Sequence, residues 1–131
     1  ASTLATIISQ RLVRKLCTKC RKERPFTEEE KQIIEKIGKK YGVEYNLNGM
    51  TYDAIGCKHC NNTGFFDRIG VFEILNVTEE IQAEIMRGKS SIEIKQEALK
   101  QGYRPLVVDG IRKVVQGYTT LEELNKKLLI Y

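Results

Sequence analysis

All four cysteines of the 131-residue sequence lie in two C-x₂-C motifs, Cys17-Thr-Lys-Cys20 and Cys57-Lys-His-Cys60. Two such motifs bring four sulfur atoms to one point, which is what a tetrahedral structural Zn²⁺ site requires. Two disulfides are the alternative, but nothing else in the sequence suggests secretion, and the short spacing suits a metal better than bridges between distant segments. The sequence therefore predicts a structural zinc ion in a cytoplasmic protein, with these ligands: Cys17, Cys20, Cys57 and Cys60.

The only histidine, His59, lies inside the second motif. It is an alternative ligand to one thiolate, but its position beside Cys60 would bend the motif, so we expect it not to bind the metal. Basic side chains near the cysteines would offset the negative charge of a zinc ion bound by four thiolates. They are Lys19, Arg21, Lys22 and Lys58.

Composition predicts a packed soluble core, in one domain or in two small modules that share an interface. Hydrophobic residues make up 41% and charged residues 30%, no apolar run is long enough to span a bilayer, and no signal-peptide pattern occurs. The formal net charge of +5 suits either an anionic partner or a solvated basic face. The alternative function is therefore a zinc-ribbon-like module that binds nucleic acid, although the basic residues alternate with acidic ones.

The segment before the first motif has apolar residues at helical spacing, already in register from Ala1 as though cut from a longer fold. We expect an amphipathic helix over residues 4–16, followed by a charged turn at 21–25. On the polar face of this helix, Arg11 and Arg14 either touch a phosphate of a ligand or lie in solvent. The apolar face is Leu4, Ile7, Ile8, Leu12 and Leu16.

Between the motifs, Thr27 and Glu30 form a capping box for a helix that ends near Gly42. Residues 43–56 have weak strand character around an Asn48-Gly49 turn. The whole loop from Cys20 to Cys57 holds 36 residues. Metal ligation contributes about 10–16 kcal/mol in small zinc peptides, against a few kcal/mol for closing such a loop. We therefore expect removal of the metal to loosen residues 17–60 and to leave the rest folded.

After the second motif, residues 68–75 are the best strand in the sequence. Asp67, Arg68 and Glu73 lie at or in this strand, where they either pair with one another or reach a neighbouring domain. Four short helices are expected to follow. Their signals are a cap at Asn76 or Thr78 with a stop near Gly88, a capping box at Ser90 and Glu93 with a stop at Gly102, an apolar face over 105–116, and a capping box at Thr119 and Glu122.

Together these patterns predict an α+β fold, mainly α with a small β component. It comprises a tetracysteine zinc module with an inserted helix, a short sheet and a C-terminal bundle of short helices. The sequence contains no phosphate-binding G-x-x-x-x-G-K-[ST] loop, no H-E-x-x-H motif and no nucleophile elbow. We therefore expect no catalytic residues in this chain and a binding or structural role.

Three segments, residues 9–20, 56–75 and 109–124, resemble the ATPases of type II secretion and type IV pilus assembly (GspE/PilB type). The resemblance implies a C-terminal part of a hexameric cytoplasmic ATPase that is peripheral at the inner membrane. It implies that 1–16 is the tail helix of a RecA-like ATPase core and 17–66 a tetracysteine zinc-binding module. Residues 67–131 would then form a short strand region, packed back on 1–16, and a C-terminal helical subdomain.

The resemblance also implies partners and cofactors. ATP and Mg²⁺ would bind only the core, because the family's phosphate-binding loop, acidic boxes and histidine box do not occur in this sequence, and no ATP hydrolysis is expected from it alone. Partners would be the RecA-like core of the same protein, neighbouring subunits of the hexamer and, as a further candidate, an inner-membrane platform protein. Neither nucleic acid nor a transmembrane segment is expected. The motifs do not separate a pilus system from a secretion system.

Overall fold

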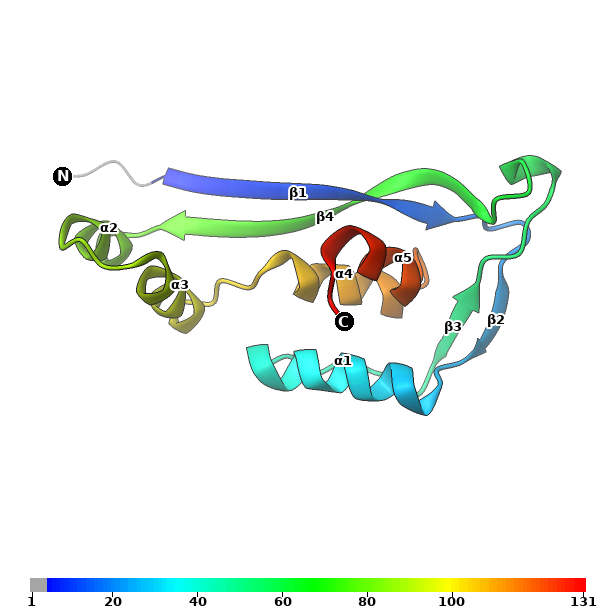
Figure 1. The fold of residues 1–131 in the computed structure, drawn as a ribbon, viewed down its shortest axis with the longest axis horizontal. Helices are drawn as coiled ribbons and strands as arrows, with labels where there is room; N and C mark the ends of the chain where they lie inside the picture. The colour runs from blue at the N-terminus through cyan, green and yellow to red at the C-terminus, as the bar shows by residue number, and fades with distance from the viewer. Residues whose placement is uncertain (1–4) are drawn as a thin grey trace.

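A long antiparallel ribbon of two strands runs the length of the protein in the computed structural model, which describes residues 5–131 (Figure 1). The helices and a second, shorter ribbon are arranged along it, so the predicted α+β class is confirmed. In chain order the elements are β1 (Ala5–Leu16), β2 (Lys22–Pro25), α1 (Glu28–Tyr41), β3 (Met50–Asp53), a 3₁₀ turn η1 (Lys58–Cys60), β4 (Phe65–Val77), α2 (Glu79–Met86), α3 (Ser91–Lys100), α4 (Leu106–Val115) and α5 (Leu121–Leu128).

The helix predicted over residues 4–16 is wrong, because the described part of this segment is strand β1 (Leu4 lies outside the described residues). β1 pairs antiparallel with β4, from Ala5 opposite Val77 to Arg14 opposite Arg68. The segment is rich in β-branched side chains, which suit a pleated surface. Its apolar spacing fits a helix as well as a strand, and pairing with a distant segment decided between them. The expectation that the strand after the second motif packs back on residues 1–16 is confirmed for the described residues.

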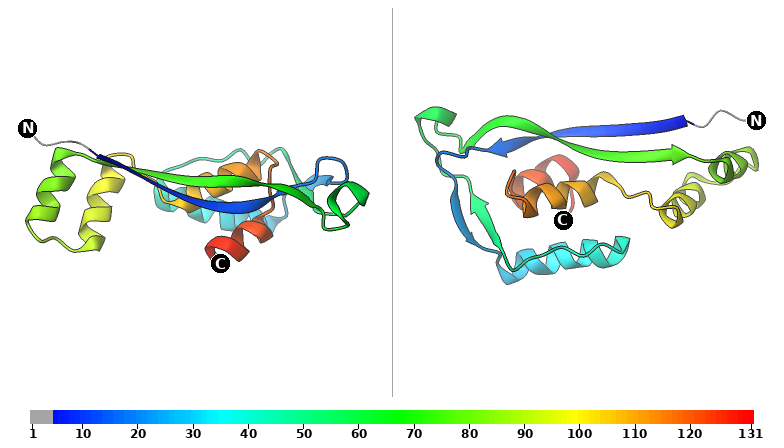
Figure 2. Two further views of the ribbon diagram at one scale, coloured as in Figure 1. Left: turned by 90° about the horizontal axis from the view of Figure 1, so that it is seen from above. Right: turned by 180° about the vertical axis from the view of Figure 1, so that it is seen from behind.

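Helices α2, α4 and α5 pack against this ribbon, whereas α3 packs on α2 and α1 packs on α4 (Figure 1). The pair α2–α3 lies at one end of the ribbon and η1 at the other (Figure 2). Side chains from the ribbon, from α1 with its flanking segments, and from α4 and α5 meet in one core. Its buried members are Val13, Phe26, Ile34, Leu47, Val71, Ile111, Val114, Leu121 and Leu124. None of the helices in residues 5–131 is long and apolar enough to cross a bilayer.

The charged turn predicted at residues 21–25 is instead strand β2, which pairs antiparallel with β3. The strand predicted in 43–56 therefore exists, but its partner lies before α1 and not across the Asn48-Gly49 turn. Arg24 explains why charged residues form a strand here: its guanidinium binds Glu30 at 2.7 Å and Asp53 at 2.9 Å. These pairs join β2, α1 and β3.

Most predicted helix ends are confirmed. α1 has its capping box at Thr27 and ends at Gly42, which is left-handed with φ +67°. Thr78 caps α2, and Ser90 opens α3 with a capping box. In each case a side-chain oxygen accepts a backbone N–H that the first helical turn leaves unpaired.

The cap of α5 is one residue later than predicted, at Thr120, whose hydroxyl accepts from the Glu123 N–H. The preceding Thr119 hydroxyl donates to the Arg14 carbonyl at 2.8 Å. The Glu123 carboxylate binds the Arg14 backbone N–H at 2.9 Å and the Arg14 guanidinium at 2.9 Å. The contact with β1 therefore places the cap one residue later than predicted. The Arg14 guanidinium is paired with Glu123, while its side chain remains 41% exposed; contact with a phosphate stays a prediction.

Glu73 also has other partners than the ones predicted. Its carboxylate accepts hydrogen bonds from the Tyr103 hydroxyl and from the Leu106 N–H, the latter at 3.0 Å. It thereby fixes the first turn of α4 to β4. Asp67 accepts from the Arg68 backbone N–H at 2.8 Å, so the predicted strand-edge ion pair is replaced by a local hydrogen bond.

Candidate metal centre

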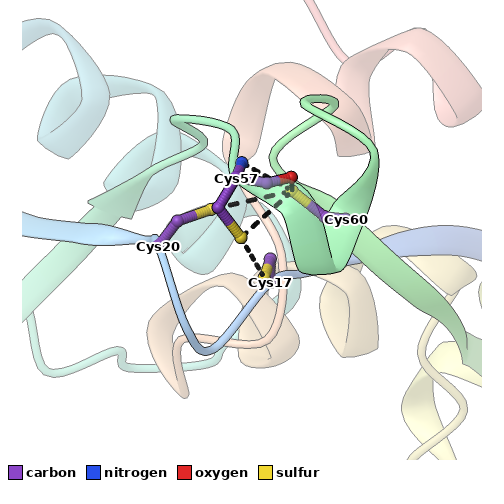
Figure 3. Close-up of side chains that lie close together, drawn as sticks. All are labelled: Cys17, Cys20, Cys57 and Cys60. Carbon is purple, nitrogen blue, oxygen red and sulfur yellow. Dashed lines mark hydrogen bonds between the residues drawn. The ribbon is translucent and has the colours of Figure 1, made fainter.

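The four cysteines come together where the two ribbons meet (Figure 3). Cys17 directly follows β1, Cys20 precedes β2, Cys57 caps η1 and Cys60 ends it. Because β1 and β4 are paired, the two motifs at their ends lie side by side, and the Cys17 N–H donates to the Gly64 carbonyl at 3.0 Å. All four sulfur atoms lie within 4.8 Å of one another.

The sulfur atoms are spaced as metal ligands are, and no two of them are bonded as a disulfide. The Cys17–Cys57, Cys20–Cys60 and Cys57–Cys60 sulfur atoms are each 3.8 Å apart, and all four cysteines are free. A disulfide bond measures about 2.05 Å. With zinc–sulfur bonds of about 2.3 Å, the edge of a regular tetrahedron is about 3.8 Å. The donor set and its separations therefore match a Zn²⁺ ion bound by four thiolates.

Backbone N–H groups point at two of the sulfur atoms. Cys60 Sγ accepts from the N–H groups of Cys57 and Gly64, both at 3.2 Å, and Cys20 Sγ accepts from Gly56 at 3.3 Å. Such donors hold thiolate ligands in position and offset their negative charge. The site is therefore built from the backbone of both motifs as well as from their side chains.

These donors help to make the pKa of Cys60 lower than that of Cys20. Burial raises the pKa of Cys60, but the backbone N–H groups and the neighbouring thiols outweigh it and lower the pKa to about 6. Burial also raises the pKa of Cys20, and so do its hydrogen bonds to the other three cysteines. The single Gly56 N–H lowers the pKa but does not offset these effects, so the pKa of Cys20 is about 11. Of these two thiols, Cys60 is therefore the one that ionises more readily to the anionic sulfur a cation needs.

His59 does not join the four sulfur atoms. Its ring stacks on Phe66, with the ring centroids 4.1 Å apart and the planes inclined by 29°. The expectation that it is not a ligand stays a prediction. Arg21, one of the basic residues near the motifs, lies over the Tyr52 ring at 4.0 Å and donates to the Gly117 carbonyl at 2.8 Å. It joins the cysteine-bearing turn to the α4–α5 connection.

Gly64 is a site residue that sequence reasoning did not single out. Its φ is +82°, and a Cβ atom would lie 2.6 Å from the Ala54 Cβ and 3.0 Å from the Ala54 backbone. Such closeness leaves no room for a side chain, and the left-handed backbone independently favours glycine. The only signal in the sequence is the position of this glycine four residues after Cys60, and that spacing alone does not reveal the contact.

Replacing Gly64 by alanine is expected to destabilise the protein by about 2–4 kcal/mol, because the new side chain strains the backbone and overlaps Ala54. It is also expected to weaken metal binding, because the Gly64 N–H donates to the Cys60 sulfur and would be displaced. Urea unfolding with metal analysis of the variant measures both effects. Gly88→Ala is the matched control: Gly88 also has positive φ, +72°, but open space around it. It should lose only about 1 kcal/mol and keep its metal; equal losses in the two variants would contradict the role of Gly64.

A comparison with known protein families identifies the family of this chain. The model of the type II/IV secretion system protein family matches residues 1–126. The chain belongs to this family. It is 38% identical over 130 residues to the type IV pilus assembly ATPase PilB of Pseudomonas aeruginosa. The matched region covers 96% of this chain and 21% of the Pseudomonas protein. The resemblance inferred from the three sequence segments is thereby confirmed.

The similar proteins include both type IV pilus assembly ATPases and type II secretion proteins. The type IV pilus assembly ATPase PilB of Thermus thermophilus is 36% identical over 95% of this chain and 13% of its own length. The type II secretion system protein E of Aeromonas hydrophila is 34% identical over 95% of this chain and 23% of its own length. The chain thus spans about a fifth or less of the length of these curated relatives.

Proposed function

We propose that this chain is the C-terminal zinc-binding part of a hexameric ATPase that powers type IV pilus assembly or type II secretion. The observation that carries the proposal is the four-thiol cluster at tetrahedral spacing, in a chain that the family model matches over residues 1–126. Its role is structural and interactive, without catalysis by this segment alone. The parent protein works in the cytoplasm, peripheral to the inner membrane, where neighbouring subunits and a membrane platform protein are its partners.

Cys17, Cys20, Cys57 and Cys60 would hold the zinc ion. Four thiolates fill a tetrahedral site, so the bound metal supplies a cross-link and leaves no position for water or substrate. The cross-link joins the end of the long ribbon to the short ribbon β2–β3, which in turn leads into α1. ATP and Mg²⁺ belong to the core that precedes this part in the parent protein.

The experiment that tests this function compares two proteins, the 131-residue chain and a longer one that includes the ATPase core. We expect about one zinc ion per chain in both, by elemental analysis. ATP hydrolysis is expected only in the longer protein. Absence of zinc from both, or ATP hydrolysis by the 131-residue chain, would contradict the proposal.

The alternative function, nucleic-acid binding, predicts tight binding with a steep dependence on salt. Several of the basic side chains that such an interface would use already bind carboxylates: Arg14 binds Glu123, and Arg24 binds Glu30 and Asp53. We therefore expect only weak binding in a titration of labelled DNA at 150 mM salt. Tight, salt-sensitive binding would favour the alternative.

A further inference from the structure

The four sulfur atoms form a chain of contacts that crosses between the two motifs. Separations of 3.8 Å join Cys17 to Cys57, Cys57 to Cys60 and Cys60 to Cys20 (Figure 3). Cys17 and Cys20 are the two ends of this chain, so its contacts divide the cysteines into two separate pairs in only one way. The pairs are Cys17 with Cys57 and Cys20 with Cys60, and each joins residues 40 positions apart.

Burial differs within each of these pairs. Cys17 is 0% and Cys60 3% exposed, whereas Cys20 and Cys57 are partly exposed. Each pair therefore combines a sulfur atom near the surface with a buried sulfur atom 3.8 Å away. An accessible thiol beside a second thiol that can resolve it is the arrangement in which cysteines form disulfides after oxidation.

The backbone holds the two motifs side by side through contacts that do not involve the sulfur atoms. The β1–β4 pairing extends to Leu16, and the next residue, Cys17, donates its N–H to the Gly64 carbonyl at 3.0 Å. Arg21 fixes the turn of the first motif through its bond to the Gly117 carbonyl at 2.8 Å. A sulfur–sulfur bond of about 2.05 Å requires each pair to close by about 1.8 Å, which side-chain rotation can supply.

We propose that the metal centre has a second, oxidised state, in which a peroxide has replaced the zinc ion by two disulfides between the motifs. The bridges join Cys17 to Cys57 and Cys20 to Cys60. This inference rests on the proposed function, because it takes the zinc-bound site as the reduced state. The bridges connect the same segments as the metal does, so the cross-link between the long ribbon and β2–β3 survives when an oxidant removes the zinc.

The reaction balances with two molecules of hydrogen peroxide per chain. In each pair, the partly exposed sulfur attacks one peroxide oxygen: an S–O bond forms, the O–O bond breaks, and the leaving hydroxide takes a proton from solvent to become water. The buried sulfur then attacks the resulting sulfenic sulfur: the S–S bond forms, the S–O bond breaks, and a second hydroxide leaves and is protonated. Each pair loses two electrons, which the peroxide gains. Zinc leaves because its ligand is the thiolate, and a disulfide sulfur carries no charge.

Disulfide mapping tests the proposal. The zinc-loaded 131-residue chain is treated with two equivalents of hydrogen peroxide, remaining thiols are alkylated, and tryptic peptides are identified by mass spectrometry. Lys19 and Lys58 lie between the cysteines of their motifs, so trypsin places all four cysteines on separate peptides. The expected cross-linked peptides pair Cys17 with Cys57 and Cys20 with Cys60. About one zinc ion per chain should be released, as measured with a chromogenic metal indicator.

The same oxidation in concentrated urea is the matched control. Without the fold, cysteines of one motif meet more often than cysteines 40 positions apart. Bridges within each motif should therefore dominate in urea. Bridges within the motifs of the native zinc-loaded chain, or sulfonic acids in place of bridges, would overturn this inference and leave the proposed function intact. A chain that binds no zinc before oxidation would instead overturn the proposed function.

Hydrogen exchange gives a second readout, because the bridges should replace the metal as a constraint. In the oxidised chain, amides in residues 17–25 and 50–64 should exchange within about threefold of their rates in the zinc-loaded chain, and chelator should not change them. The reduced chain should exchange about 100-fold faster in these segments after chelation. A similar increase on oxidation alone would show that the bridges do not hold the motifs together and would overturn the inference.

Discussion

Removal of the metal by a chelator is expected to loosen the strands and turn around the cysteines and to leave α1, α4 and α5 folded. The β2–β3 ribbon and η1 contribute little to the core, so the metal is their main constraint; its contribution of about 10–16 kcal/mol far exceeds the cost of closing the loop. α1 differs, because Ile34 is fully buried in the core shared with α4 and α5. The region that loosens is therefore narrower than residues 17–60.

Hydrogen exchange with and without chelator measures this result. Amides in residues 17–25 and 50–64 should exchange about 100-fold faster after metal removal, while those of α4 and α5 should change little. Cys57→Ser provides the control, because losing one of four ligands opens the site. The variant should bind no zinc, should show the same exchange pattern as the chelated protein, and should not respond to chelator. Unchanged exchange around the cysteines would contradict a structural metal.

Replacing Glu123 by alanine is expected to cost about 3 kcal/mol of unfolding free energy. The Glu123 side chain is 1% exposed, and it accepts hydrogen bonds from the Arg14 backbone N–H and guanidinium. The truncation leaves that N–H without a partner and removes a charge-assisted pair. The cost stays moderate because the Arg14 side chain is 41% exposed and its guanidinium can turn to water. Urea unfolding measures the change.

The neighbouring Glu122 is the matched control. It lies on the same helical turn and is 82% exposed, in a loose pair with Lys126 at 3.9 Å. Glu122→Ala should change the unfolding free energy by no more than about 0.5 kcal/mol. Similar losses in both variants would show that the effect belongs to α5 as a helix and not to the contact with β1.

The pH dependence gives an independent check on the same pair. Burial raises the pKa of Glu123, but Arg14 outweighs it and holds the pKa below the ordinary value of 4.5. A carboxyl with a lowered folded-state pKa stabilises the protein above its unfolded pKa, and this stabilisation is lost as the pH falls through the folded-state value. The difference in stability between the native chain and Glu123→Gln should therefore be constant above pH 4.5 and should narrow below it.

The sequence alone identified the cysteines that the structure brings together, the α+β class and most helix starts. These features depend on local patterns: the spacing within a C-x₂-C motif and the capping side chains near Thr27, Thr78 and Ser90. Such patterns act over a few residues, so they can be read before anything is known of the tertiary structure. The metal itself stays a prediction.

Only the tertiary structure decided what the first segment and the cap of α5 would be. Residues 5–16 fit a helix and a strand equally well by spacing, and pairing with β4 made them a strand. In this strand, Arg14 forms hydrogen bonds with Glu123 and Thr119. Because Thr119 is bound to β1, the cap of α5 lies at Thr120. Hydrogen bonds between segments far apart in the sequence outweighed local propensity here, because burial made their loss more costly than a less favourable local conformation.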